Sequence, residues 1–309
     1  MTAKNVHRLD GLEPDNLLAF LAVIGLLRAL EAVDSCESDP RMKVRARASW
    51  DTNEFPLRPR LHLAKAMLQK DIVERAAKGV DILAAAYKFN GHEKLKLTPG
   101  QARTEMTNAV KATDVERSAL WAALTSDAAT KDKGVERTPF CLLDVAQTSF
   151  LKTLVAVVSA SKGRQKAIEN ALFHQWRWSD DTPSFRWDPI EDTRHAYRAL
   201  APSDDKQKVE SGANILAAIA LPVLTVVPQQ RGASVRLLVV GGASQQGVFT
   251  FAWPIWNQPA SLSAIRAMLT HEDLWKLNGL KHLSVERVML TQRIAPSRYN
   301  NFTRARPLP

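Results

Sequence analysis

The most hydrophobic stretch of the chain lies near its beginning. Residues 17–27 read LLAFLAVIGLL, and the first charged side chain after them is Arg28. A helix that is apolar on all sides belongs in the interior of a fold. We therefore expect a buried helix that begins at an N-cap, Asp15, and runs to about residue 33, with Gly25 permitting close packing on another element. The run is too short to span a bilayer, which takes about 20 apolar residues, and acidic residues precede it where a signal peptide is basic.

Basic and small apolar residues alternate after this helix, in RMKVRARASW at residues 41–50. Lys43, Arg45 and Arg47 occupy every second position, which predicts a strand with one basic and one apolar face. Two interpretations stay open: charges that protect a solvated edge strand from aggregation, or cations laid along a phosphate backbone. The basic character continues through a proline-containing loop that carries Arg58 and Arg60.

The middle of the chain has mainly helical patterns. Residues 61–87 and 101–125 are expected to be helical, whereas residues 126–139 have a loop-like composition. Residues 140–160 are apolar again and are expected to become helical from about residue 146.

The last third mixes helices and strands. Residues 241–247 have the composition of a hairpin loop between the strands on either side. The elements expected here are a helix over 214–221, strands over 223–227, 235–240 and 248–253, a helix from Ser261 to about residue 270, and a strand over 285–294. The sequence thus predicts an α+β fold, with a helix-rich lobe at residues 1–205, a polar linker at 203–212, and a C-terminal unit at 206–309 built on a mostly antiparallel sheet.

Aromatic, arginine and acidic residues are concentrated in residues 176–202, WRWSDDTPSFRWDPIEDTRHAYRALAP, which prolines divide into turns. The segment is either a clamp that fixes a long connection onto the core or a contact with a ligand or nucleic acid. We assign Arg177 and Trp178 to nucleic-acid contact, since a cation beside an aromatic ring suits a single strand. The residues assigned a structural role are Arg186, Trp187, Asp188, Glu191, Asp192, Arg194 and Tyr197.

Composition narrows the class of protein. The formal net charge is +10 and the pI is about 9.7, and a basic surface favours nucleic acid, anionic membranes or acidic proteins. Two cysteines far apart give neither a disulfide framework nor a CxxC pair. We found no HxxxH pair and none of the common catalytic or phosphate-binding motifs. We therefore expect a cytoplasmic protein with no catalytic residue, no metal and no cofactor.

Other residues have side chains suited to nucleic acid. Ser159 to Lys166 resembles an anion-binding loop at a helix start, and amide or guanidinium groups in turns can read base edges. An ordinary polar surface turn is the alternative at each place. The candidates are Lys162, Arg164, Lys166, Gln229, Gln230, Arg231, Gln245, Gln246, Arg298, Asn300, Asn301 and Arg304.

Four segments, in this order, resemble one family. They are LDGLEPDNLLAFLAVIGLLRAL, RWDPIEDTRHAYRAL, GANILAAIALPVLTVVP with FAWPIWNQPASLSAIRAML, and RYNNFTRA near the end. Together they are similar to the large subunits of type I CRISPR-Cas surveillance (Cascade) complexes, subtype I-G (formerly I-U). The chain is short for such a subunit, so an extended C-terminal helical bundle is not expected.

The resemblance implies a non-catalytic role in RNA-guided antiviral defence. Such a subunit helps to recognise the short motif beside the target (the PAM), to open the duplex and to stabilise the R-loop. Its partners would be the guide-RNA complex, target double-stranded DNA, other Cascade subunits and a helicase-nuclease, with no membrane. Two alternatives remain: a metal-dependent nuclease with carboxylates at Asp188, Glu191 and Asp192 near His195, or a protein scaffold without DNA contact.

Overall fold

The helix α1 (Leu17–Cys36) lies at the centre of the protein, as its apolar sequence predicts. The structure, a computed structural model, describes residues 2–144, 148–191, 208–295 and 300–309. The N-cap is Asn16, one residue later than predicted. Its side-chain oxygen accepts hydrogen bonds from the backbone N–H groups of Leu18 (2.9 Å) and Ala19 (3.4 Å), the positions that an N-cap oxygen reaches.

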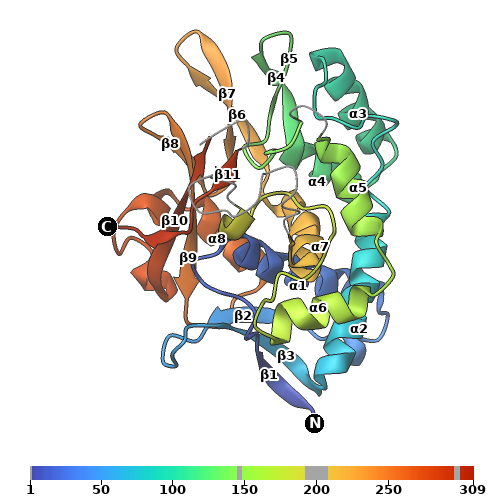
Figure 1. Ribbon diagram of the computed structural model, residues 1–309, viewed down its shortest axis with the longest axis vertical. Coiled ribbons are helices and arrows are strands. Elements are labelled where there is room, and N and C mark those ends of the chain that lie inside the picture. The colour runs from blue at the N-terminus through green and yellow to red at the C-terminus, as the bar shows by residue number, and fades with distance from the viewer. Residues whose placement is uncertain (1, 145–147, 192–207, 296–299) are drawn as a thin grey trace.

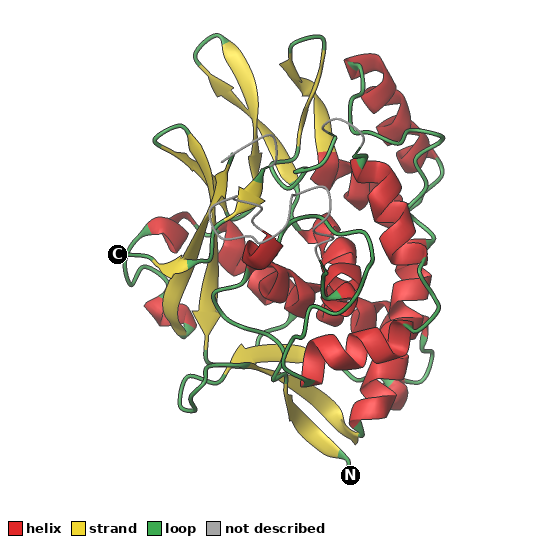
Figure 2. Cartoon of the chain, in the orientation of Figure 1, coloured by secondary structure: helices red, strands yellow, loops and turns green. Residues whose placement is uncertain are grey.

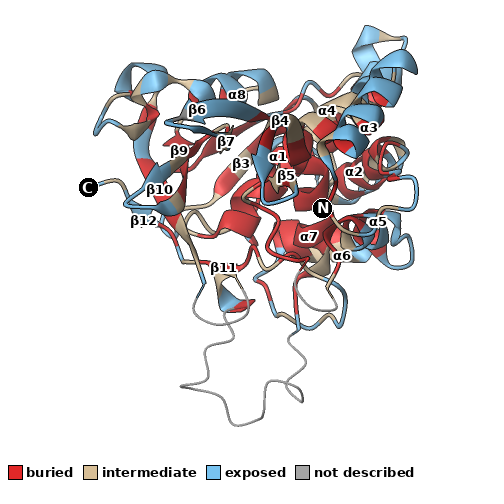
Figure 3. Cartoon of the chain, turned by 90° about the horizontal axis from the view of Figure 1, so that it is seen from above, coloured by how far each residue is buried: buried red, intermediate tan, exposed pale blue. Residues whose placement is uncertain are grey.

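Two buried helices form the middle layer of the fold. The second, α7 (Ser211–Ala220), includes the last two residues of the predicted linker and packs directly on α1. A Cβ atom at Gly25 would lie 1.8 Å from the carbonyl oxygen of Leu216, so only glycine permits this approach. Figure 3 shows both helices as buried over most of their length.

Further helices cover one side of this pair (Figures 1 and 2). The outer helices α2 (Gln69–Ala84), α5 (Phe150–Ser159) and α6 (Arg164–Phe173) pack against α1 or α7. The predicted helix over 101–125 is two helices, α3 (Pro99–Lys111) and α4 (Val115–Leu124). They separate where Thr113 has a positive φ of 52° and Asp114 caps α4.

A five-stranded antiparallel sheet covers the other side of α1. Its order is β11 (Asn301–Phe302), β10 (Val285–Ile294), β9 (Val248–Trp256) and β8 (Gly242–Gln245), with β12 (Arg306–Pro307) also paired to β10. Phe20 of α1 stacks on Trp253 of β9, with 5.4 Å between ring centroids. The helix α8 (Leu262–Thr270) follows, capped by Ser261 as predicted. The predicted α+β class with an antiparallel C-terminal sheet is confirmed.

A second sheet has three strands in the order β1 (Lys4–Arg8), β3 (Pro59–Met67) and β2 (Arg47–Trp50). The prediction of helix from residue 61 is wrong over β3. Leu61 and Leu63 are buried on alternate positions, and strands pair with β3 on both sides, whereas α2 begins only at Gln69. Leucine, lysine and alanine favour helices, so composition alone misassigned this segment.

Two hairpins complete the fold and extend from the same end of the molecule (Figure 1). The predicted loop at 126–139 contains the hairpin of β4 (Thr125–Lys131) and β5 (Gly134–Arg137). The strand β7 (Ser234–Val239) pairs with β6 (Val226–Arg231), and not with β9 as predicted, because Gly232 with a φ of 58° closes a tight turn between them. The expected hairpin loop at 241–247 holds β8, which pairs with β9.

Among the described residues, no helix is both long enough and apolar enough to span a membrane.

Candidate nucleic-acid interface

The predicted basic strand contributes to the outer face of the three-stranded sheet. Residues paired across antiparallel strands project to the same face, and Ala48, Leu61 and His7 are paired and buried, which fixes the inner face. The rows on the opposite, outer face are Arg47, His62 and Val6, followed by Ser49, Arg60 and Arg8. We call these six residues, with Arg45, the basic sheet face.

Arg45 and Arg47 are the exposed cations of this face. The alternation of burial at residues 44–48 agrees with the prediction, since Val44, Ala46 and Ala48 are buried and the two arginines between them are exposed. Backbone N–H groups of Val44 and Arg45 donate to the carboxylate of Asp34 on α1 at 2.9 and 2.8 Å, which fixes the segment on the core. In the described part of the chain, no carboxylate lies within ion-pair distance of either arginine. Their charge is therefore free for an external anion.

Lys43 lies outside the strand. It is the half-buried residue that ends the short helix η1 (Pro40–Met42). The strand β2 begins only at Arg47, so the predicted strand is shorter than expected and Arg45, with a positive φ of 45°, also precedes it. Arg45 and Arg47 are nevertheless both exposed.

Arg58 and Arg60 are occupied by contacts within the protein. Arg58 donates from Nε to the carbonyl oxygen of Asp10 at 2.9 Å and lies 3.5 Å from the Glu13 carboxylate. Arg60 forms ion pairs with Asp51 and Glu54. Partial burial, followed by the charge of Arg60, lowers the pKa of His62, and its ring nitrogen lies 2.8 Å from the Ser49 hydroxyl. The uncompensated positive charge of this face therefore lies at Arg45 and Arg47, because Arg60 and Arg8, nearer to or on β1, are paired with carboxylates.

The free side of β2 is covered at its centre. Ala48 and Ala260 exchange backbone hydrogen bonds of 2.9 and 2.8 Å, and the indole of Trp256 donates to the Ala48 carbonyl at 2.7 Å. Edge charges are needed where backbone groups stay unpaired. This closure weakens the interpretation of Arg45 and Arg47 as edge protection.

The loop that resembles an anion site divides into one buried and two exposed cations. Arg164 is buried, donates to the carbonyls of Ala160 (2.8 Å) and Val158 (2.9 Å), and pairs with Asp81. It serves the fold by joining the end of α5 to α6. Lys162 and Lys166 are exposed, and Lys166 lies 3.0 Å from the Glu169 carboxylate.

The structure brings Lys166 beside Arg177, although eleven positions of sequence separate them. Both line a pocket of about 320 Å³ together with His174. Arg177 is exposed. Trp178 is half-buried and its indole N–H donates to Asp188 Oδ2 at 2.9 Å, so its polar edge is already occupied. Of the predicted pair, the arginine is the accessible member.

The buried part of the same segment joins distant elements. Trp187 stacks on Phe185 at 4.3 Å between centroids and donates to the Phe140 carbonyl at 2.9 Å. Asp188 accepts hydrogen bonds from Asn16 (3.0 Å), Trp178 and the backbone of Ile190 (3.1 Å). Burial raises the pKa of Asp188 in spite of these bonds.

Glu191 is buried beside Asp188, and Ser184 donates a hydrogen bond to it. Burial, with the charge of Asp188, raises the pKa of Glu191 to about 8. Arg186 is half-buried, with a positive φ of 63°. Asp192, Arg194, His195 and Tyr197 lie outside the described residues. Within the described ranges, no group of three or more His, Cys, Asp or Glu side chains is arranged to hold a metal ion.

The predicted glutamine turns lie at the hairpin end. Gln229, Gln230, Gln245 and Gln246 are exposed, and Gln230 donates to the Gly232 carbonyl at 2.6 Å. The side chain of Arg231 and all of Arg298 lie outside what the structure describes. The β6–β7 and β8–β9 hairpins project in the same direction (Figure 1), so they present amide groups at one end.

The candidate residues near the C-terminus differ in their exposure. Asn300 is half-buried, and Asn301 is buried, with its side-chain oxygen accepting the Phe302 N–H at 2.8 Å. Arg304 is exposed but pairs with Asp15 at 2.8 Å and Glu13 at 3.1 Å. These contacts attach the C-terminal strands to the start of α1.

One basic site was missed by the sequence analysis. Arg293 of β10 meets Arg137 of β5 in a pocket that the β4–β5 hairpin borders. Part of this site could have been recognised in the sequence, because Lys131 and Lys133 are two nearby cations in the segment TKDKGVER. The sequence could not indicate that Arg293 lines the same pocket, because Arg293 belongs to a strand far away in the chain.

No protein-family model matches the chain, and the search of curated proteins finds no match.

Proposed function

We propose that this protein is a non-catalytic, nucleic-acid-binding subunit of a type I CRISPR RNA-guided surveillance (Cascade) complex that acts in the cytoplasm. The observation that carries the proposal is the basic sheet face, on which Arg45 and Arg47 are exposed and have no described carboxylate within ion-pair distance. The ordered resemblance of four segments to Cascade large subunits supports the particular complex.

The basic sheet face suits a phosphate backbone. Arginine binds phosphate oxygens through its planar fork, and phosphate contacts supply most sequence-independent affinity. Arg45 and Arg47 are both exposed and lie two positions apart in the chain, so one strand of nucleic acid can reach both. In this proposal the face holds target DNA and thereby helps to open the duplex and stabilise the R-loop.

The hairpin end suits recognition of the PAM. Glutamine amides can pair with base edges in a groove, and Gln229, Gln230, Gln245 and Gln246 are exposed on two neighbouring hairpins. Guide pairing then reads the remaining target sequence, as in other RNA-guided systems. Other Cascade subunits, the guide RNA and a helicase-nuclease are the proposed partners.

The test is salt-dependent binding of labelled double-stranded DNA by the purified protein, measured by fluorescence anisotropy. The double variant R45A/R47A should bind more weakly and flatten the log–log salt slope by roughly 0.7–0.9 for each lost phosphate contact. The matched control is R103A/K152A, which removes two exposed cations that are paired with Asp127 and Glu93. Equal slopes for the two double variants would remove the basic sheet face from the interface.

Membership of the complex is tested separately. The protein should co-elute with a reconstituted guide RNA and backbone subunits in size-exclusion chromatography. A protein that co-elutes but whose R45A/R47A variant leaves DNA affinity unchanged would be a scaffold without direct DNA contact. A protein that never co-elutes with such a complex would not be a Cascade subunit.

A further inference from the structure

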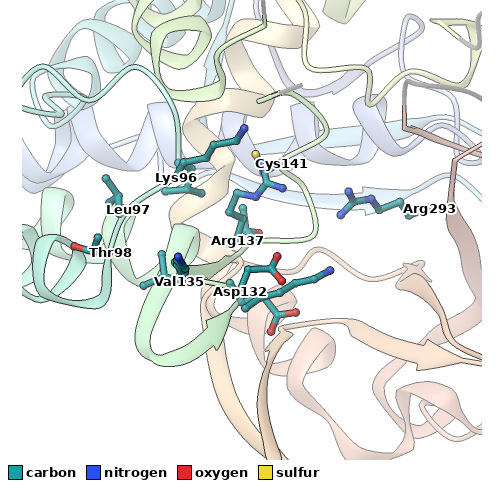
Figure 4. Close-up of a pocket in the computed structure, with 14 residues that line it drawn as sticks. Lys96, Leu97, Thr98, Asp132, Val135, Arg137, Cys141 and Arg293 are labelled. Carbon is teal, nitrogen blue, oxygen red and sulfur yellow. The ribbon is translucent and has the colours of Figure 1, made fainter. Parts of the chain in front are cut away.

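A basic pocket of about 490 Å³ opens at the hairpin end of the molecule (Figure 4). The β4–β5 hairpin forms one wall, the loop at residues 95–98 before α3 forms another, and Arg293 enters from β10. We call it the hairpin pocket. Five cations line it against two carboxylates, those of Asp132 and Glu136; the cations are Lys96, Lys131, Lys133, Arg137 and Arg293.

Two arginines face each other across this pocket. In Figure 4 the guanidinium group of Arg293 points toward Arg137. Burial, together with the charge of Arg137, lowers the pKa of Arg293. Arg293 uses one nitrogen to donate to the Pro139 carbonyl at 3.2 Å. The two like charges lie in a partly buried site, where their repulsion is screened less than in water.

The nearby carboxylates neutralise these arginines only in part. Asp144 lies 3.7 Å from Arg137 Nη1, but it also accepts the backbone N–H groups of Leu95 and Phe150, both at 2.7 Å. Arg137 Nη1 is buried and has no hydrogen-bond acceptor among the described atoms. A buried donor without an acceptor is costly, so the protein itself compensates the charge of Arg137 only in part.

The carboxylate of Glu136 is also engaged by groups other than Arg137 and Arg293. It accepts the backbone N–H of Leu237 at 2.7 Å and lies 3.5 Å from Arg236. Asp132 lies at the exposed turn of the hairpin between Lys131 and Lys133. The pocket therefore keeps an excess of positive charge around Arg137 and Arg293.

We infer that the hairpin pocket binds a phosphate group, carried either by a free nucleotide or by the 5′ end of a nucleic acid, between Arg137 and Arg293. Paired guanidinium forks match the geometry of phosphate oxygens, and the volume lies in the range of small-molecule sites. Lys131 and Lys133 supply further charge at the entrance. This site is separate from the basic sheet face and does not depend on the proposed function.

The pocket is a binding site and not a nucleophilic one. Cys141 lines it, but burial raises the pKa of this thiol, with the charge of Asp144 acting in the same direction. The thiolate, which is the reactive form, is therefore disfavoured.

Isothermal titration calorimetry with pyrophosphate and with AMP tests the inference. Wild type should show saturable binding to at least one of them. Arg293→Gln should weaken it tenfold or more, and the double variant K131A/K133A, which changes only exposed side chains, should weaken it severalfold. R103A/K152A serves as the matched control and should bind as wild type does. Circular dichroism melting establishes that each variant is folded.

A second arm identifies the source of the phosphate. Oligonucleotides labelled at the 3′ end, with either a 5′ phosphate or a 5′ hydroxyl, are compared by anisotropy. A tenfold preference for the 5′ phosphate that Arg293→Gln abolishes assigns a nucleic-acid terminus, whereas AMP binding without this preference assigns a free nucleotide. The inference is overturned if wild type binds neither pyrophosphate, AMP nor the 5′ phosphate, or if folded R293Q and K131A/K133A both bind like wild type.

Discussion

The side-chain amide of Asn16 donates a 3.0 Å hydrogen bond to Asp188 Oδ1, so the residue that caps the central helix also holds the aromatic segment. Trp178 donates to the other oxygen of the same carboxylate at 2.9 Å. Both oxygens of Asp188 are therefore occupied within the protein, in a buried environment. This arrangement uses the carboxylate as a link between α1 and residues 176–191.

Replacing Asp188 by alanine should destabilise the protein without changing its salt-dependent binding to DNA. The change leaves the Asn16 amide and the Trp178 N–H without their acceptor in the interior, and each such group costs about 1–3 kcal/mol. We expect the free energy of unfolding, measured by urea denaturation, to fall by roughly 2–4 kcal/mol.

Asp181→Ala is the matched control, since Asp181 is an exposed acid of the same segment. Its effect should stay within about 0.5 kcal/mol. Equal stabilities for the two variants would contradict the structural role of Asp188. Magnesium- or manganese-dependent DNA cleavage that disappears in Asp188→Ala would instead support the nuclease alternative.

Glu191 should make the protein less stable as the pH rises. Its pKa is raised from 4.5 to about 8 in the folded state, mainly by burial. Between these values the unfolded chain releases the proton and the folded protein keeps it, so the contribution of Glu191 to stability is greatest below pH 4.5 and is lost by about pH 8. The slope from this one group is at most about 1.4 kcal/mol per pH unit.

Glu191→Gln should remove that part of the pH dependence, because the amide can still accept the hydrogen bond from Ser184 and carries no proton to lose. Urea denaturation of both proteins from pH 5 to pH 8 measures the difference. Burial raises the pKa of Glu210 to about 7. Glu210 therefore contributes a similar decline in stability to both proteins, and this contribution cancels in the comparison. Parallel stability profiles would show that Glu191 is not protonated in the folded state.

Arg164 and Lys166 should respond in opposite ways to truncation. Arg164→Ala removes hydrogen bonds to two backbone carbonyls and the contact with Asp81, and we expect a loss of roughly 2–4 kcal/mol in the free energy of unfolding. Lys166 is exposed beside Arg177, so Lys166→Ala should leave stability unchanged and reduce DNA affinity at low salt. A stable Arg164→Ala protein with weakened DNA binding would place Arg164 in the interface instead.

Elements with a strong local pattern could be read from the sequence. The central helix follows from its continuous apolar run, the helix at 262–270 from its Ser261 cap, and the strand at 285–294 from its own apolar and β-branched residues. The segment at 61–67 could not be assigned, because its strand state depends on β1 and β2 pairing with it on both sides. The same holds for residues 126–139, whose hairpin rests on β6 and β7, far away in the sequence.

The candidate site residues also divide into those with a local sequence pattern and those whose environment is set by distant parts of the chain. Alternation alone indicated that Arg45 and Arg47 project outward, and both are exposed. Arg164 is buried and pairs with Asp81, 83 positions earlier, and no local sequence pattern indicates this contact. The pairing of Arg137 with Arg293 is equally non-local.

The contact between Gly25 and Leu216 has a consequence for biosynthesis. The apolar helix α1 leaves the ribosome well before α7, which covers it closely and is synthesised about 190 residues later. At 5–20 residues per second the interval is roughly 10–40 s. During that time one of the most hydrophobic surfaces of the chain lacks its final neighbour, so production of this protein in cells should depend on chaperones that shield nascent chains.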